Sequence, residues 1–133
     1  MQEMRMKRTI GLILYLWQLP QNLVGLLLVS IYAPEVSFPW RDVRLFYSKR
    51  MRGGISLGRY IIVSDYFQEI GKQEKHEYGH CRQSMMLGPL YLPVVGLPSL
   101  LWAAFYRPKA SDPNGYFRFY TEKWADRLGG VRR

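Results

Sequence analysis

Two histidines and a glutamate stand close together in the segment His76-Glu77-Tyr78-Gly79-His80, which has the form H-E-x-x-H. On an α-helix, residues four apart lie about 40° apart around the axis, so both imidazoles face the same way. This geometry suits two ligands of a tetrahedral zinc ion, and it leaves Glu77 beside the metal as a candidate general base. The chain contains no other histidine. The spacing therefore predicts a zinc site built on His76 and His80.

The residues around the motif are typical of a helix. Residues 73–75 lead into it, residues 81–87 continue it, and Gly88-Pro89 is a typical stop. Gly79 is unfavourable inside a helix, but it allows another backbone or a ligand to come close. Cys81 is the single cysteine, so no disulfide within the chain is expected. On a helix it points about 100° away from His80, which favours a buried structural thiol over a metal ligand.

A second pair of acidic residues at helical spacing follows downstream. Residues 121–126 read T-E-K-W-A-D and contain E-x-x-x-D. With both patterns the chain resembles the gluzincin metallopeptidases, in which a helix carrying E-x-x-x-D follows the H-E-x-x-H helix, and it is similar to the small minigluzincin-like members. The resemblance implies that Glu122 is the third zinc ligand. It also implies that Asp126 orients a ligand histidine through the other ring nitrogen of that histidine.

Two segments before the motif favour β-structure. Residues 43–47 and 55–64 are rich in β-branched and aromatic side chains, and Gly58 marks a bulge or a close approach. Pro34, Pro39 and Trp40 indicate a loop, and residues 50–54 a basic turn. These features predict a short antiparallel hairpin ahead of the motif helix.

The resemblance extends to the strand just before the motif. Zincin folds use such a strand as the upper edge of the active-site cleft, where an extended peptide adds to the sheet through main-chain hydrogen bonds. By resemblance, the substrate-binding residues are Gly54, Ile55, Ser56, Leu57 and Gly58. A plain hairpin that only stiffens the fold is the alternative.

Simpler interpretations exist for each charged residue. The two histidines are also compatible with ordinary polar positions on a helix surface. The acidic residues are compatible with solvated ion pairs at helical spacing. Such pairs would join Glu77 to Arg82 or Lys72, Glu122 to Lys123 or Arg118, and Asp126 to Arg127.

Length and charge limit the possible partners. The 133 residues suffice for one domain with its own core, and the formal net charge is +9. Such a charge indicates nucleic acid or anionic lipid as a partner. The basic residues flank apolar segments, and the sequence contains no nucleic-acid motif, so membrane lipid is favoured and nucleic acid is not expected.

The first apolar run covers residues 10–32 and is interrupted by polar residues at 18–22. A signal peptide is disfavoured, because residues 31–33 are a poor cleavage site. A kinked transmembrane helix has the required length, and a helical hairpin turning at residues 20–22 is a second possibility. A pair of buried helices in a soluble core is the third.

The second apolar run covers residues 85–106. Its prolines and glycines disfavour an uninterrupted spanning helix. If His76, His80 and Glu122 bind one ion, the chain must also return to the side of the membrane from which it left. The run is therefore expected to be a re-entrant hairpin, an interfacial segment or a protein-packed loop. Basic residues at both of its ends agree with this arrangement.

These elements together predict an α+β fold. It would be a minimal zincin-like domain with the motif helix, a short hairpin, and a second metal-ligand helix over residues 116–128, stopped by Gly129-Gly130. Residues 1–33 would form an apolar membrane-associated segment. Residues 34–133 would form the metallopeptidase domain, with residues 85–106 as an insert.

The function expected first is a zinc metallopeptidase acting on a peptide or protein substrate. Glu77 would take the proton of the attacking water, and a further side chain would stabilise the transition state. Tyr66, Tyr116, Arg118 and Tyr120 are the candidates for that side chain. The alternative is a non-catalytic membrane protein in which zinc joins two helices, and a basic nucleic-acid binder is a third class. The expected location is a membrane, with the catalytic part on the cytoplasmic side.

Overall fold

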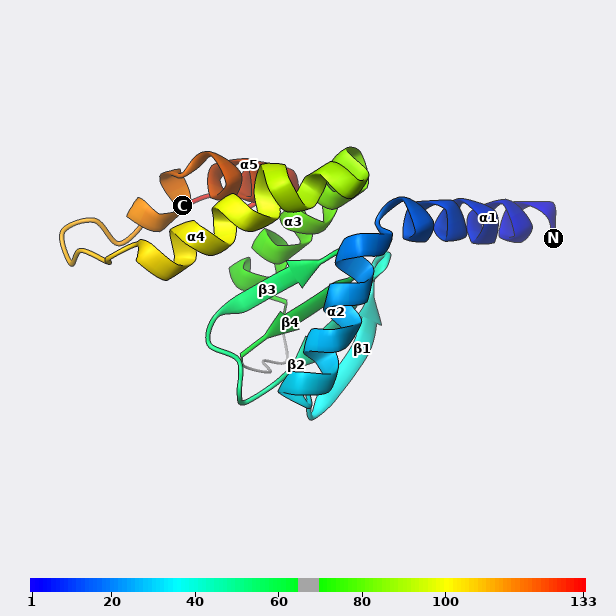
Figure 1. The fold of residues 1–133 in the computed structure, drawn as a ribbon, viewed down its shortest axis with the longest axis horizontal. Helices are drawn as coiled ribbons and strands as arrows, with labels where there is room; N and C mark the ends of the chain where they lie inside the picture. Colours follow the sequence, from blue (N-terminus) through cyan, green and yellow to red (C-terminus); the bar gives the residue numbers. More distant parts are fainter. Residues whose placement is uncertain (65–69) are drawn as a thin grey trace.

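A computed structural model describes residues 1–64 and 70–133. Within these residues the chain has an α+β fold, as the sequence predicts, with five α-helices and a four-stranded mixed sheet (Figure 1). The helices are α1 (Gln2–Trp17), α2 (Leu19–Tyr32), α3 (Lys72–Leu87), α4 (Leu97–Phe105) and α5 (Tyr120–Gly129). The strands are β1 (Val36–Trp40), β2 (Val43–Tyr47), β3 (Gly54–Leu57) and β4 (Tyr60–Val63).

The sheet has the order β1-β2-β4-β3, so β3 lies at one edge. β4 pairs with β2 in parallel and with β3 in antiparallel orientation. The prediction of one strand over residues 55–64 was wrong, and so was its pairing with residues 43–47 as an antiparallel hairpin, because β4 runs parallel to β2. Gly58 has a φ of +64°, which turns the chain, so that β3 and β4 form a hairpin with Gly58 and Arg59 as its loop.

The loop expected around Pro39 and Trp40 was also wrong, because residues 36–40 form β1. β1 pairs only with β2 among the described strands and is therefore an edge strand. A proline is tolerated there because the missing N–H costs no ladder bond on the open side.

The core lies between α3 and one face of the sheet. Val43, Leu45 and Tyr47 alternate with Arg44 and Phe46 along β2, and the first three are buried. This alternation directs every second side chain of the strand toward the helix. The same cluster contains Ile61 and Val63 of β4 and Tyr78 and Cys81 of α3.

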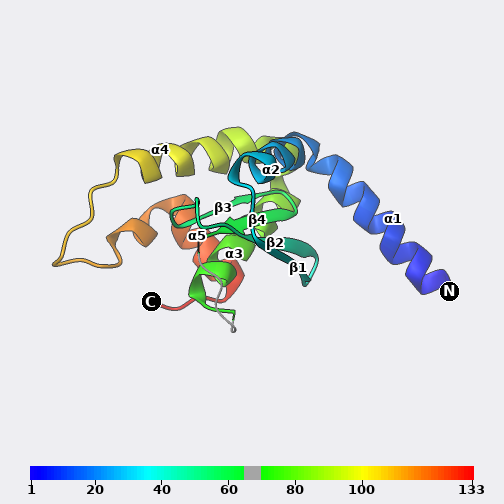
Figure 2. The ribbon, with the colours of Figure 1, turned by 90° about the horizontal axis from the view of Figure 1, so that it is seen from below.

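Helix α2 covers the opposite face of the sheet (Figure 2). It is held there by polar residues that point inward. The Asn22 side chain accepts a hydrogen bond from the backbone N–H of Arg59 in the β3–β4 loop, and Gln21 donates to Ser84 of α3.

The first apolar run bends earlier than residues 20–22, where the hairpin was expected to turn. Helix α1 ends at Trp17, and α2 starts at Leu19 with Pro20 in its first turn, where the missing N–H is tolerated. Among the residues described, no single helix has the length and apolar character needed to cross a bilayer; α1 and α2 meet that test only together, bent by 84°.

The second apolar run is not one helix. After α3 the chain makes a 3-10 turn (Gly88–Leu90) and a π-helical segment (Leu92–Gly96) before α4 begins. The prolines and glycines of this segment account for the irregular backbone. Helix α4 lies on the same side of the molecule as α2, over α5 (Figure 2).

The second predicted metal helix starts later than expected. Residues 115–118 form a 3-10 turn, and α5 covers Tyr120–Gly129. Tertiary contacts explain the difference: Trp102 donates a hydrogen bond to the Tyr116 carbonyl and stacks on Phe119. Gly130, with φ +77°, ends the helix at the place where a stop was expected.

Candidate metal centre

The two helices that carry the acidic and histidine motifs pack closely against each other. A Cβ atom at Gly79 of α3 would lie 1.8 Å from the carbonyl oxygen of Ala125 in α5, so only glycine permits this approach. The expectation that Gly79 allows another backbone to come close is confirmed. The close contact brings the His76 and His80 side of α3 against the Glu122 side of α5.

His76, His80 and Glu122 form a buried cluster whose potential ligand atoms all lie within 4.8 Å of one another. His76 Nε2 is 3.7 Å from Glu122 Oε1, and His80 Nε2 is 3.2 Å from Glu122 Oε2. Ligand atoms about 2.0–2.2 Å from a tetrahedral zinc ion lie about 3.3–3.6 Å from each other. The two nitrogens and the carboxylate therefore fit a metal ion of this kind.

The other ring nitrogen of His76 is held by Asp126, as the resemblance implies. His76 Nδ1 lies 2.6 Å from Asp126 Oδ1, and both side chains are buried. Arg133 donates to both oxygens of Asp126, from Nε at 2.7 Å and from Nη2 at 3.1 Å. Because Nδ1 donates to a carboxylate, Nε2 is the ring nitrogen of His76 that faces Glu122 and that would bind a metal ion.

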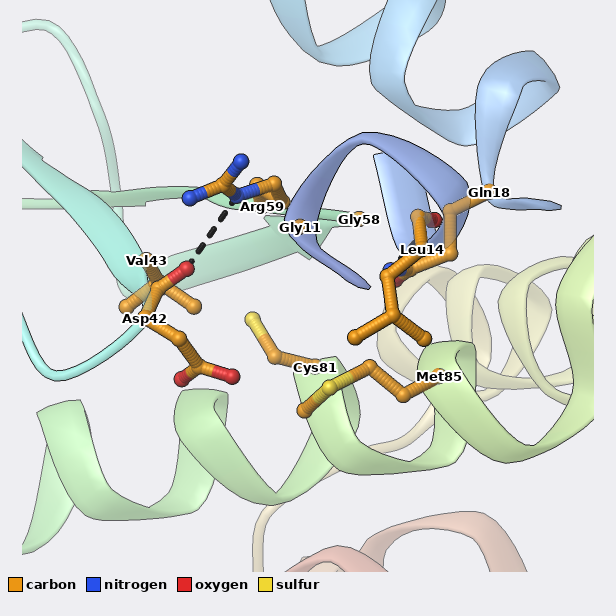
Figure 3. Close-up of a pocket in the computed structure, with 9 residues that line it drawn as sticks. All are labelled: Gly11, Leu14, Gln18, Asp42, Val43, Gly58, Arg59, Cys81 and Met85. Atoms are coloured by element: carbon orange, nitrogen blue, oxygen red, sulfur yellow. Dashed lines mark hydrogen bonds between the residues drawn. The ribbon is translucent and has the colours of Figure 1, made fainter. Parts of the chain in front are cut away.

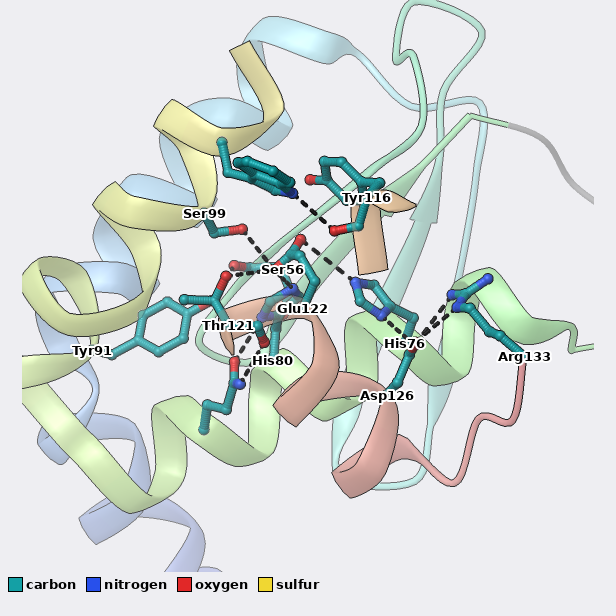
Figure 4. A network of polar contacts seen from close by, with 12 residues as sticks. Ser56, His76, His80, Tyr91, Ser99, Tyr116, Thr121, Glu122, Asp126 and Arg133 are labelled. Carbon is teal, nitrogen blue, oxygen red and sulfur yellow. Dashed lines mark hydrogen bonds and ion pairs between the residues drawn. The ribbon is translucent and has the colours of Figure 1, made fainter. Parts of the chain in front are cut away.

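His80 is oriented by a residue of its own helix. Its Nδ1 lies 2.6 Å from Gln83 Oε1, while Gln83 Nε2 donates to the Thr121 carbonyl at 2.9 Å. Because the amide nitrogen is engaged by a carbonyl, the amide oxygen must face His80, and His80 Nδ1 must carry the proton. His80 Nε2 therefore faces Glu122, and it is the ring nitrogen that would bind a metal ion (Figure 4).

Glu122 contacts every other member of the cluster. Its Oε2 accepts hydrogen bonds from Ser99 of α4 and from Thr121. Burial raises the pKa of Glu122, but hydrogen bonds from His76 and His80 and their charges lower it more, so that it lies well below its usual range. Burial lowers the pKa of His80, but Glu122 and Glu77 outweigh it and bring the value to about 9. The Glu122 carboxylate is therefore ionised at neutral pH, as a metal ligand must be.

Glu77 lies in the same buried region and faces the edge of the sheet. Its Oε1 would be 3.0 Å from a Cβ atom at Gly54, so the carboxyl group lies directly against β3. Burial raises the pKa of Glu77, and the nearby histidines oppose the rise. A carboxylate with a raised pKa is a better proton acceptor than one in water.

A cavity of about 860 Å³ joins these groups. It is lined by His76, His80, Glu77 and Glu122, by β3, by α2 and by α4. Of the predicted substrate-binding residues, Gly54, Ile55, Ser56 and Leu57 border this cavity, whereas Gly58 lies in the hairpin loop outside it.

Of the side chains predicted to stabilise the transition state, the described ones differ in whether they border this cavity. Tyr116 borders the cavity, and its pKa is raised by burial and by the nearby Glu122. Arg118 is exposed and pairs with Asp112, and the Tyr120 hydroxyl donates to the Val94 carbonyl. Tyr66 lies outside the described residues.

Three residues at the centre were not singled out from the sequence: Gln83, Ser99 and Arg133. Gln83 stands three residues after His80, and this spacing on a helix was the available signal. Ser99 and Arg133 reach the site only through the tertiary fold, so no local pattern marks them.

A second, small cavity lies beneath α1 (Figure 3). Its volume is about 40 Å³, and its lining includes Leu14, Cys81 and Met85. This space suits a water molecule and not a substrate. Cys81 is buried with its Sγ 2.9 Å from Ser56 Oγ, in agreement with the expected structural thiol.

No family model, curated protein or solved structure matches this chain. The resemblance to gluzincins therefore stands on the H-E-x-x-H and E-x-x-x-D residues alone.

Proposed function

We propose that this chain is a zinc-dependent peptidase of the gluzincin type. One observation carries the proposal: the buried cluster of His76, His80 and Glu122 borders the same cavity as Glu77 and the edge strand β3. A metal, a general base and a strand for binding a peptide are what hydrolysis of an extended peptide requires.

The residues have separate roles in the proposed reaction. His76, His80 and Glu122 would hold the ion, and a zinc ion bound there would supply Lewis-acid chemistry. Glu77 would accept the proton of the attacking water and pass it to the leaving amine, and its raised pKa suits both steps. Asp126 and Gln83 would keep the ligand histidines in the required tautomer.

Strand β3 would hold the substrate by its free edge. The Ser64 N–H donates to the Gly53 carbonyl across the hairpin. Because the direction of backbone groups alternates along an antiparallel strand, those of Gly54 and Ser56 point away from β4. The Ser56 carbonyl accepts a long hydrogen bond from Tyr91, at 3.4 Å. The N–H groups of both residues and the Gly54 carbonyl would remain for an extended peptide.

Tyr116 is the best-placed partner for the developing oxyanion. Its raised pKa keeps the hydroxyl protonated, so that it would donate a hydrogen bond at neutral pH. It borders the cavity that contains the proposed ligands.

The test compares Glu77→Gln with the wild-type protein after both are loaded with zinc. We expect Glu77→Gln to keep its zinc and to lose peptide hydrolysis by about 10²-fold or more, because only proton transfer is removed. The exposed Arg82 of the same helix provides the control, since Arg82→Gln should retain both properties. No hydrolysis by the wild type with zinc bound would favour the structural zinc site instead. Equal hydrolysis by wild type and Glu77→Gln would show that Glu77 is not the general base.

A further inference from the structure

The side of the molecule formed by α2 and residues 86–105 is an exposed apolar face. Residues 10–32 and 83–106 contain no Asp, Glu, Lys or Arg. Large apolar side chains of both segments nevertheless point outward, among them Leu23, Leu26 and Leu27 of α2 and Leu97, Leu100 and Leu101 of α4. The two helices lie on the same side of the sheet (Figure 2). Large apolar side chains exposed on one side of a molecule indicate an interaction site.

The polar residues of the first run point in the opposite direction. Gln18, Gln21 and Asn22 are at most 1% exposed, whereas Leu27 is 60% exposed. Gln18 and Gln21 hydrogen-bond to Ser84, and Asn22 bonds to the backbone of Arg59. A water-facing helix shows the reverse arrangement. The medium that suits the outer side of α2 is therefore apolar.

The metal cavity opens on this apolar face. Val24 of α2 and Leu97 and Leu100 of α4 line the cavity and are also 39%, 53% and 59% exposed, so they form its rim. On the inner side of α4, Ser99 donates a hydrogen bond to Glu122 at 3.0 Å. One helix, with a diameter of about 10 Å, thus separates the outer apolar surface from the metal centre.

We propose that the apolar face inserts into one leaflet of an anionic lipid bilayer, and that peptide segments leaving this bilayer reach the metal centre between α2 and α4. This inference rests on the peptidase function proposed above. Charge complementarity selects the bilayer: exposed basic residues flank both uncharged runs, Arg5, Lys7 and Arg8 before the first and Arg107 and Lys109 after the second. Headgroup phosphates would pair with these cations while the leucines enter the acyl region.

The geometry also defines the substrate class. A peptide lying along β3 would pass the rim residues of α2 and α4, which are apolar. The cleaved bond would therefore lie in the part of a membrane-anchored protein that directly adjoins the bilayer, with large apolar side chains next to that bond. A freely soluble peptide would lack the high local concentration that a shared membrane provides.

The first test measures how deeply the apolar face enters the acyl region of a lipid bilayer. In a Cys81→Ser background, single cysteines at Leu27, Leu100 and Lys123 carry an environment-sensitive fluorophore, and the full chain is mixed with vesicles of phosphatidylglycerol and phosphatidylcholine containing brominated acyl chains. We expect quenching at positions 27 and 100 and none at 123, which is an exposed, charged position on α5. Unquenched fluorescence at 27 and 100 would refute the insertion.

The second test uses a mixed-sequence peptide library, either fused to a synthetic transmembrane anchor in these vesicles or free in solution. We expect the zinc-loaded protein to cleave the anchored library at least about tenfold faster, close to the bilayer, and Glu77→Gln to cleave neither. Equal rates would overturn the membrane route and leave the peptidase function standing. Cleavage of neither library by a protein that holds zinc would overturn both.

Discussion

At the scale of single residues, the proposed metal site depends on which ring nitrogen of each histidine has no hydrogen-bond partner that orients the ring and can therefore bind the ion. Asp126 and Gln83 each hold one Nδ1 atom, and thereby turn both Nε2 atoms toward Glu122. The two partners differ in origin: Asp126 comes from α5, whereas Gln83 lies one turn after His80 on α3. Replacement of Asp126 or Gln83 should therefore change the orientation of one histidine without removing that histidine from the site.

This difference predicts an order of zinc affinities. Glu122→Ala removes a ligand and should weaken zinc binding most. Asp126→Ala and Gln83→Ala should each weaken it by about 10–100-fold, as changes at residues that orient ligands typically do. Lys123→Ala, an exposed neighbour, should leave the dissociation constant unchanged. Competition with a zinc chelator measures all four, and a smaller effect for Glu122→Ala than for Asp126→Ala would contradict the assignment.

A further prediction concerns Cys81. Burial raises the pKa of its thiol, and the side chain is 1% exposed. The thiolate is the reactive form, so we expect very slow reaction with a thiol reagent in the folded protein and rapid reaction in denaturant. A cysteine at position 123, in the Cys81→Ser background, is the exposed control. Equal rates for the two cysteines in the folded protein would contradict the buried position.

At this scale the sequence identified the residues that have a local pattern. The two histidines and Glu77 lie within one H-E-x-x-H motif, and the resemblance that includes E-x-x-x-D implied Glu122 and Asp126. Ser99 was missed because it meets Glu122 only after segments 23 residues apart fold together. Arg133 was missed because it lies beyond the end of α5, where helical spacing to Asp126, seven residues before it, no longer applies.

At the scale of elements, the contact between α3 and α5 brings the three proposed metal ligands together. Gly79→Ala should destabilise the protein by about 3 kcal/mol, because its new methyl group would meet backbone that cannot easily move. Gly11→Ala in α1 is the matched control: nothing lies within 4 Å of its Cβ position, and alanine favours the helix. Chemical denaturation measures the free energy of unfolding of both variants. Equal midpoints for Gly79→Ala and wild type would show that the helices do not pack this closely.

The elements with regular periodicity were predictable, and those shaped by tertiary contacts were not. Strand β2 and helix α3 agree with the expected residues 43–47 and the helix ending before Gly88. β1 was missed because Pro39 disfavours a strand everywhere except at an edge, and an edge is a property of the whole sheet. The later start of α5 depends on Trp102, which is distant in sequence.

At the scale of the whole molecule, the chain is layered from polar to apolar. The sheet, α3 and α5 form one part, and the uncharged surface of α2 and α4 forms the side on which the cavity at His76, His80 and Glu122 opens. Because His80 and Glu122 lie in one cluster, residues 85–106 must begin and end on the same side of any bilayer. Their position over α5 agrees with this requirement (Figure 2). This arrangement places the opening of the cavity next to the membrane from which we propose that the substrate comes.

The zinc content of the purified full chain tests the central claim most directly. Elemental analysis should find one zinc per wild-type chain and one per Glu77→Gln chain, because Glu77 is not assigned as a ligand. His76→Ala should lose most of its zinc, since one of the three proposed protein ligands is gone and the carboxylate of Glu122 loses one of its partners. A full equivalent of zinc in His76→Ala would contradict the metal centre described above.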